Sequence, residues 1–170
     1  MTSQIEDIKY KADRNLNKAQ ILKICDLKWL LKGENIIITG YCGTGKSFIS
    51  CAIGLRACLN EYKVAYYNCD KLFYEVKYAK SCGNYLKMFD KLIKKDLIII
   101  DDFGLEIMDK ESRMFLFELL EERTEKKSLI ISSQLSLDSW YDIIGDKTLA
   151  DAICDRIISL SRKDIRNLVC

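Results

Sequence analysis

The chain has 170 residues, of which 49% are hydrophobic and 31% are charged, as in soluble globular proteins rather than disordered ones. Its length predicts one domain, and its net charge of +2 leaves any contact with nucleic acid to local patches. The absence of histidine excludes histidine-based catalysis and most zinc sites.

The eight cysteines are spread along the chain without a C-x-x-C pair. Residues 1–14, MTSQIEDIKYKADR, are charged and lack an apolar signal core. No apolar run reaches the ~18 residues that would span a bilayer. We therefore expect a cytoplasmic protein without membrane contact, whose cysteines are reduced and mostly buried as small apolar side chains.

Short apolar runs alternate with amphipathic segments along the chain. The runs predict strands at 35–39, 63–69, 97–100 and 128–132. The segments that follow predict helices at 47–60, 71–80, 84–95, 109–127 and 147–158. Strands that alternate with helices predict an α/β fold, with a parallel sheet sandwiched between helices.

Finer features of these helices are also expected from the sequence. The expected N-caps are Asp70, Asp109, and Thr148 together with Asp151 in the capping-box spacing. In the helix at 84–95, the spacing of Leu86, Phe89 and Ile93 predicts a shared buried face.

The stretch GYCGTGKS at residues 40–47 fits the pattern G-x-x-x-x-G-K-[ST], between a predicted strand and a predicted helix. The glycines let the backbone curl until successive N–H groups point at phosphate oxygens, and the helix adds its positive end. In this pattern Lys46 supplies a charge between the β- and γ-phosphates, and Ser47 offers its hydroxyl to Mg²⁺. A strand–turn–helix with glycines for geometry alone is the alternative. The residues expected to contact the nucleotide are Gly40, Tyr41, Cys42, Gly43, Thr44, Gly45, Lys46, Ser47 and Phe48.

The sequence LIIIDDFG, residues 97–104, provides a second feature, an aliphatic strand followed by two aspartates. Phosphoryl transfer needs a carboxylate at a strand end that holds Mg²⁺ through its water shell. Asp101 is expected to be this carboxylate, and Asp102 is expected to polarise the attacking water. A solvated strand end is the alternative, but the two motifs together predict ATP, or another nucleoside triphosphate, with Mg²⁺.

With these motifs, the chain resembles the insertion-sequence helper ATPases of the IstB/DnaC-like group, AAA+ proteins related to helicase loaders and to the initiator DnaA. The resemblance covers nearly all of the chain and implies a P-loop NTPase of the AAA+ (ASCE) type with a five-stranded parallel core. It implies one domain over 1–170, with a lead-in helical region at 1–34 and the P-loop core at 35–170. The residues that carry its most specific part, SSQLSLDSW and GDKTLADAICDR, are Ser133, Gln134, Leu135, Trp140, Gly145, Asp146, Leu149, Ala150, Ala152, Ile153, Asp155 and Arg156.

The resemblance also implies two catalytic roles. It places Gln134 at the sensor-1 position, which contacts the γ-phosphate or the attacking water. It matches Arg156 with an arginine finger that reaches the ATP of a neighbouring subunit and makes hydrolysis depend on assembly. A helix-end ion pair with Asp151 or Asp155 is the structural alternative for Arg156.

The chain departs from the family pattern in three places. Asp102 stands where many AAA+ proteins have glutamate, and its shorter side chain predicts slow hydrolysis. The short C-terminus leaves the sensor-2 arginine unassigned, with Arg162 and Arg166 as candidates. The N-terminal helical region with which relatives engage a transposase, a helicase or DNA is nearly missing.

Six lysines within nineteen positions predict a DNA contact, provided that an oligomer aligns them along the phosphate backbone. Two solvated helix faces are the alternative. The lysines are Lys77, Lys80, Lys87, Lys91, Lys94 and Lys95.

The motifs together with this resemblance imply a slow ATPase that forms an open ring or filament of identical subunits on DNA. It would assist target selection by a transposase, which the segment SSQLSLDSW favours, or load a replicative helicase. The alternative is a non-catalytic, ATP-gated DNA-binding or adaptor module, which Asp102 favours and Lys46, Asp101 and Arg156 oppose. A small-molecule kinase is disfavoured, because no arginine-rich lid follows the third strand.

Overall fold

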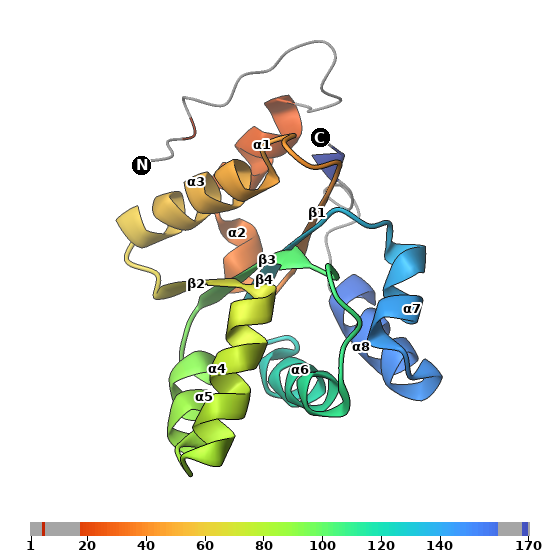
Figure 1. Cartoon of the computed structure of the whole chain (residues 1–170). Coiled ribbons are helices and arrows are strands. Elements are labelled where there is room, and N and C mark those ends of the chain that lie inside the picture. The colour runs from red at the N-terminus through yellow and green to blue at the C-terminus, as the bar shows by residue number, and fades with distance from the viewer. Residues whose placement is uncertain (1–4, 6–17, 160–167, 170) are drawn as a thin grey trace.

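The computed structural model describes residue 5, residues 18–159 and residues 168–169, so the sensor-2 candidates Arg162 and Arg166 lie outside the described residues. One parallel sheet of five strands lies between two layers of helices (Figure 1). The strand order is β2-β3-β4-β1-β5, and every pairing is parallel. The predicted α/β fold with a five-stranded parallel core is confirmed.

The first four strands agree with their predicted ranges to within one residue, except at the end of β3, and β5 had no predicted range. They are β1 (Ile36–Thr39), β2 (Val64–Asn68), β3 (Leu97–Phe103), β4 (Ser128–Ser133) and β5 (Leu168–Val169). β3 extends beyond the predicted end at residue 100, because Asp101 still pairs with Asn68 of β2 and Phe103 pairs with Ser133 of β4 after a shift in register.

The helices fall close to their predicted ranges. They are α1 (Lys18–Cys25), α2 (Lys28–Leu31), α3 (Lys46–Leu59), α4 (Cys69–Ser81), α5 (Tyr85–Ile93), α6 (Lys110–Arg123), the 3-10 turn η2 (Leu137–Ser139), α7 (Trp140–Ile144) and α8 (Lys147–Ser159). α5 and α6 are shorter than predicted, since the lysine-rich ends of both segments leave the helix.

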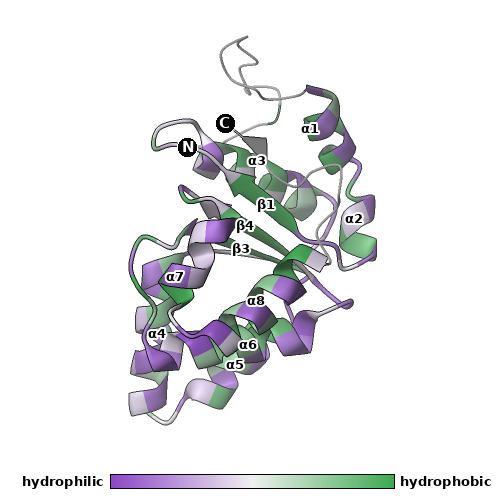
Figure 2. Ribbon diagram, turned by 90° about the vertical axis from the view of Figure 1, so that its right-hand side faces the viewer, coloured by the Kyte–Doolittle hydropathy of each residue, from purple (hydrophilic) through white to green (hydrophobic). Residues whose placement is uncertain are grey.

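The alternation of side chains along the strands builds two cores. Ile36 and Ile38 of β1 face α1, α2 and α3, whereas Ile37 between them faces the helices α4 to α8. Figure 2 shows the apolar strands β1, β3 and β4 between these layers. Trp140 is fully buried, and its ring lies 4.5 Å from that of Phe103.

Two of the predicted helix caps are wrong. Asp109 caps α6 as expected, since its side chain accepts from the Ser112 N–H at 2.9 Å. α4, however, begins two residues earlier than predicted and is capped by Asn68 instead of Asp70. The capping box expected for α8 is replaced by Asp146, which accepts from the Leu149 N–H at 3.0 Å. In both helices the side chain just before the first turn takes the cap position.

The predicted buried face of α5 is also partly wrong. Phe89 and Ile93 pack against the core, but Leu86 is 76% exposed, and Leu92 is the buried residue of this helix. The seven cysteines within the described residues are free, as expected, although only Cys69 and Cys154 are buried. In the same part of the chain, no helix is both long and apolar enough to cross a membrane.

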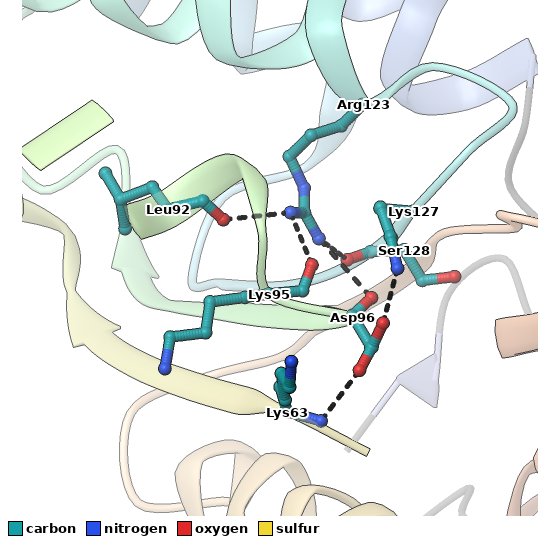
Figure 3. Close-up of polar contacts among 7 residues, drawn as sticks. All are labelled: Lys63, Leu92, Lys95, Asp96, Arg123, Lys127 and Ser128. Atoms are coloured by element: carbon teal, nitrogen blue, oxygen red, sulfur yellow. Dashed lines mark hydrogen bonds and ion pairs between the residues drawn. The ribbon is translucent and has the colours of Figure 1, made fainter. Parts of the chain in front are cut away.

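A buried arginine ties the layers together at the amino edge of the sheet (Figure 3). Arg123, 1% exposed at the end of α6, donates to the carbonyl groups of Leu92, Lys95, Asp96 and Ser128. These carbonyls belong to the end of α5, the turn before β3 and the start of β4. Burial lowers the pKa of Arg123 to about 10, so the guanidinium stays charged near neutral pH.

Candidate functional site

The glycine-rich segment 40–47 joins the carboxyl end of β1 to the start of α3. Gly43 and Gly45 have φ angles of 76° and 93°, a left-handed conformation that side chains other than glycine rarely adopt. α3 has fourteen residues, and its first intrahelical bond runs from the Ile49 N–H to the Gly45 carbonyl at 3.0 Å. The backbone N–H groups of residues 46–48 therefore have no acceptor within the helix, which makes this helix start suited to an anion.

Lys46 lies across this loop. Its side chain is 5% exposed, and its Nζ donates to the carbonyl groups of Gly40 at 2.7 Å and Tyr41 at 2.9 Å. An ammonium group has three N–H donors, so a bound anion can receive the third. Thr44 closes the loop by donating to the Tyr41 carbonyl at 2.7 Å. Tyr41 and Cys42 point outward, since both are exposed.

A β-bulge places both aspartates against the neighbouring strand. Between the pairs Ile100–Ile131 and Phe103–Ser133, the two aspartates of β3 face the single residue Ser132 of β4. The Ser132 hydroxyl donates to the Asp101 carboxylate and accepts from the Asp102 N–H at 3.3 Å. One residue further on, the Ser133 carbonyl accepts from the Gly40 N–H at 3.2 Å. β4 thus lies between the loop and the aspartates and contacts both.

Asp101 is 2% exposed, and hydroxyl donors contact both of its oxygens. Ser132 donates to Oδ1, and the Tyr66 hydroxyl on β2 donates to Oδ2 at 2.5 Å. Burial and this bond raise the pKa of the Tyr66 phenol above its ordinary value. The carboxylate is thereby held in one orientation without a cationic partner in these contacts, and each oxygen retains a lone pair for another donor.

Asp102 lies beside Asp101 but in a different environment. It is half-buried, its φ angle is 58°, and its Oδ2 accepts from the Asn68 amide at 3.2 Å. Because Asn68 also caps α4 through its Oδ1, one side chain connects Asp102 to the start of that helix.

Ser47, the second residue of α3, is exposed at the start of a helix that packs against β3. Cys51 lies four residues after Ser47, on the same side of the helix. Burial and the negative charge of Asp101 raise the pKa of the Cys51 thiol. A hydroxyl and a buried carboxylate on facing elements fit Mg²⁺, which takes few protein ligands and completes its shell with phosphates and water.

Gln134 directly follows the last residue of β4 and is half-buried, so it lies at the same edge of the sheet as the loop. Arg156 does not join this cluster. Its guanidinium donates to the Ala152 carbonyl at 2.8 Å, forms an ion pair with Glu121 and lies over the ring of Phe117 at 4.7 Å. The ion pair therefore uses Glu121 and not Asp151 or Asp155.

A backbone contact of Arg156, a residue of α8, shows which edge of the sheet it lies near. Its carbonyl accepts from the Asn35 amide at 3.5 Å, and Asn35 immediately precedes β1. The loop 40–47 follows the other end of β1. Arg156 thus lies near the amino edge of the sheet, at the opposite end of β1 from the phosphate loop of its own chain.

Sequence reasoning did not identify Ser132, Tyr66, Asn68 and Cys51 as neighbours of the aspartates. Ser132 lies on β4, and Tyr66 and Asn68 lie on β2, the two strands that flank β3. The observed register aligns Asn68 with Asp101 because β2 begins at Val64 opposite Leu97, one residue later than predicted. Nothing in the sequence marks the bulge itself.

A parallel sheet with this strand order, a glycine-rich loop after β1 and a carboxylate pair on β3 define a P-loop protein of the AAA+ type. A family model, described as IstB-like ATP binding protein, matches residues 1–165. The chain belongs to this family, which implies ATP as the ligand of the loop.

The curated relatives are named as ATP-binding proteins of insertion sequences. An insertion-sequence ATP-binding protein of Sinorhizobium fredii is 38% identical over 153 residues, covering 90% of this chain and 62% of the relative. The IS232 ATP-binding protein of Bacillus thuringiensis is 30% identical over 155 residues, covering 91% and 62%. The chain therefore spans about three fifths of the length of these relatives.

Solved structures show the same fold at low sequence identity. The DnaC helicase loader has a TM-score of 0.80 at 17% identity, covering 96% of this chain and 94% of that one. The initiator DnaA, bound to AMPPCP and single-stranded DNA, has a TM-score of 0.76 at 18% identity, covering 88% and 47%. These similarities concern the fold alone.

Proposed function

We propose that this chain is an ATPase that binds ATP with Mg²⁺ in the loop 40–47 and hydrolyses it at a site completed by a second copy. The observation that carries this proposal is the arrangement around β4, which holds the loop on one side and Asp101 with Asp102 on the other. Phosphate-binding donors and a carboxylate pair thus meet at one edge of the sheet.

Each residue has a definite task in this proposal. The N–H groups of the loop and Lys46 hold the phosphates, and Ser47 and Asp101 hold Mg²⁺, directly and through water. When bound, Mg²⁺ neutralises charge that develops on the phosphates. Asp102 and Gln134 orient the attacking water. Asn68 and Tyr66 keep the two carboxylates in place through their hydrogen bonds.

Arg156 is proposed to act on the loop of a neighbouring copy. It lies at the opposite end of β1 from its own loop, yet its side chain is 27% exposed, so another chain can reach it. Its pair with Glu121 holds the guanidinium on the surface until a phosphate competes for it. Such an arrangement makes hydrolysis depend on assembly.

The biological setting is proposed from the relatives. The curated relatives are named as insertion-sequence ATP-binding proteins, which favours assistance to a transposase. The structural neighbour DnaC is a helicase loader, so loading of a replicative helicase is the less favoured role. For DNA, the predicted lysines divide into two groups. Lys77 pairs with Asp109 and Lys80 lies over Tyr85, whereas the lysines of α5 remain exposed. α5 is thus the better candidate for a DNA contact.

A non-catalytic, ATP-gated adaptor is the second candidate. Asp102 favours it, because its short side chain and its bond to Asn68 hold the carboxylate close to β3. This candidate and the ATPase share the phosphate loop and differ only in turnover.

The deciding experiment is ATP hydrolysis at rising protein concentration, with and without double-stranded and single-stranded DNA. The proposal expects a rate per subunit that climbs with concentration and with DNA. A flat, negligible rate together with tight ATP binding would support the adaptor instead.

Two variants separate an arginine that acts in trans from a structural one. Arg156→Ala should retain ATP binding and lose the concentration-dependent rate by about 10³-fold. Glu121→Gln breaks the same ion pair but keeps the arginine, so it should hydrolyse at least as fast as the wild type. Equal losses in the two variants would mean that Arg156 is structural, and Arg56→Ala serves as an exposed control.

A further inference from the structure

Ser133, the last residue of β4, makes contacts through its backbone and through its side chain. Its carbonyl accepts from the Gly40 N–H of the phosphate loop at 3.2 Å. Its side chain is fully buried and belongs to a different set of contacts. An alanine at this position would keep the bond to the loop, so whatever requires serine here requires its hydroxyl.

The Ser133 hydroxyl joins three segments. It donates to the Phe103 carbonyl at the end of β3 at 2.8 Å. It accepts from the Leu135 N–H at 3.1 Å and from the Trp140 indole N–H at 3.3 Å. A serine hydroxyl has one donor and two acceptor sites, so these three bonds use all of them. The oxygen therefore has a fixed place relative to β3, to α7 and to the turn after β4.

The two serines that end β4 face opposite sides of the sheet. The Ser132 hydroxyl donates to Asp101, the proposed Mg²⁺ carboxylate. The Ser133 hydroxyl bonds instead to Phe103 and Trp140, which pack in the core on the side of α4 to α8. The side chain of Ser133 is therefore placed to influence the site through the backbone that it holds, and not as a ligand of nucleotide or metal.

That backbone includes the turn that carries Gln134. The bond from the Leu135 N–H to the Ser133 oxygen spans Gln134 and anchors the chain on both sides of it. Among the described residues, no hydrogen bond engages the side-chain amide of Gln134, so this amide can serve a ligand. The turn thus fixes where the Gln134 side chain starts and leaves its end free.

The same hydroxyl reaches the strand of the aspartates. Phe103 directly follows Asp102, and Ser133 directly precedes Gln134. The bond from the Ser133 hydroxyl to the Phe103 carbonyl therefore joins the backbone beside both residues that are proposed to orient the attacking water. The bulge interrupts the pairing of β3 with β4 just before this point, so the side-chain bond adds a constraint where the ladder is irregular.

We propose that Ser133 is a positioning residue for hydrolysis, whose hydroxyl holds Gln134 at a set distance from Asp102. A misplacement of about 1 Å can cost about 100-fold in rate. The inference rests on the proposed function for the roles of Gln134 and Asp102, and it adds the group that keeps them in register. It predicts a loss of turnover without a loss of nucleotide affinity, because the carbonyl of Ser133 and not its hydroxyl contacts the loop.

Two alanine variants on the same strand test this assignment. Ser133→Ala should lower kcat by about 10- to 100-fold, measured at the protein concentration that gives the highest rate per subunit. Its dissociation constant for the non-hydrolysable analogue AMPPCP should stay within about 2-fold of the wild-type value.

Ser128→Ala is the matched control. Ser128 is also fully buried on β4, but its hydroxyl has no hydrogen-bond partner among the described residues. This variant loses the same atom from the same strand and should keep both constants within about 2-fold of the wild type. Equal kcat values in Ser133→Ala and Ser128→Ala overturn the proposal.

A double variant shows whether Ser133 acts through Gln134. Gln134→Ala should lower kcat at least as much as Ser133→Ala does. Once the amide is removed its position no longer matters, so the double variant should lie within about 2-fold of Gln134→Ala. Losses that multiply would mean that the hydroxyl acts by another route, which contradicts the proposal. Melting curves confirm that each variant is folded at the assay temperature.

Hydrogen exchange measured by NMR tests the positioning without turnover. In Ser133→Ala the Leu135 N–H loses its acceptor, so it should exchange at least about 10-fold faster. The Gly40 N–H keeps its acceptor, the Ser133 carbonyl, and should exchange as in the wild type. Unchanged exchange of the Leu135 N–H overturns the proposal even if kcat falls. If the wild type binds ATP without hydrolysing it, the proposed function fails, and the exchange rates alone then support or overturn the positioning by Ser133.

Discussion

The two edges of the sheet treat buried polar groups in opposite ways. At the amino edge, Arg123 donates to four carbonyl groups from the end of α5, the turn before β3 and the start of β4, so these acceptors have a buried donor, although the Arg123 Nε itself has no partner among the described residues. At the carboxyl edge, the start of α3 presents N–H groups without an acceptor in the helix, and among the described residues two hydroxyl groups donate to the Asp101 carboxylate. The first edge is built for stability and the second for a ligand. Substitutions at the amino edge should therefore change the free energy of unfolding and leave ATP affinity unchanged, and substitutions in the ligand site at the carboxyl edge should do the reverse.

The largest effect is expected for Arg123→Ala. It removes the side-chain donor from the carbonyls of Leu92, Lys95 and Ser128, and we expect the free energy of unfolding to fall by about 3–5 kcal/mol in urea titrations. Arg123→Lys keeps the charge but not the planar fork, so about half of the loss should remain.

ATP affinity of the folded fraction should be unchanged in both variants, with Lys126→Ala as an exposed control. A loss below about 1 kcal/mol in Arg123→Ala would show that water replaces the guanidinium and that the amino edge is less closed than its burial indicates.

Lys46→Ala is expected to do the reverse. The variant removes the charge that meets the phosphates, so ATP affinity should fall at least about 100-fold, equivalent to about 2.7 kcal/mol. Calorimetric titration with ATP and Mg²⁺ measures this change, and Lys23→Ala controls for loss of a lysine elsewhere. Ordinary affinity in Lys46→Ala would refute the phosphate loop.

The smallest effect concerns Asp109, a structural residue at the carboxyl edge. Lys77 and the Ser112 N–H lower the pKa of Asp109 to about 2, below the ordinary value of 3.8. A depressed pKa in the folded state stabilises the fold above the ordinary value, and this contribution disappears as the pH falls through about 2.

Asp109→Ala should accordingly reduce the free energy of unfolding by about 1 kcal/mol at pH 7, mainly through loss of the helix cap, since the exposed ion pair is screened. Urea titrations should show the gap to the wild type shrinking between about pH 4 and pH 2. A gap independent of pH would mean that packing and not the carboxylate matters there.

Much of the fold follows from the sequence because its signals are local and strong. The β-branched runs before Gly40 and Asp101 predict β1 and β3, and the parallel sheet follows from their alternation with helices. The phosphate loop is equally local, since glycines at 43 and 45 occupy left-handed positions. Asp109 caps its helix for the same reason.

The remainder depends on contacts between distant segments. Asp70 looks like a cap, but Asn68 lies one residue ahead of the helix and also reaches Asp102 on another strand. Leu86 fits the apolar period of α5, yet no neighbouring element among the described residues covers it, and its side chain is exposed. Arg123, one arginine in a charged helix, becomes a structural centre only when β3 and β4 bring their first carbonyls to it.

The bulge at the aspartates limits which carboxylate side chain can stand at residue 102. At φ 58°, residue 102 adopts a left-handed conformation that aspartate and asparagine tolerate better than longer side chains do. Asp102→Glu, which would restore the carboxylate length of many AAA+ proteins, therefore works against the backbone that positions it. The length of the carboxylate and the register of β3 at this site are therefore coupled, and neither can change alone without moving the carboxylate.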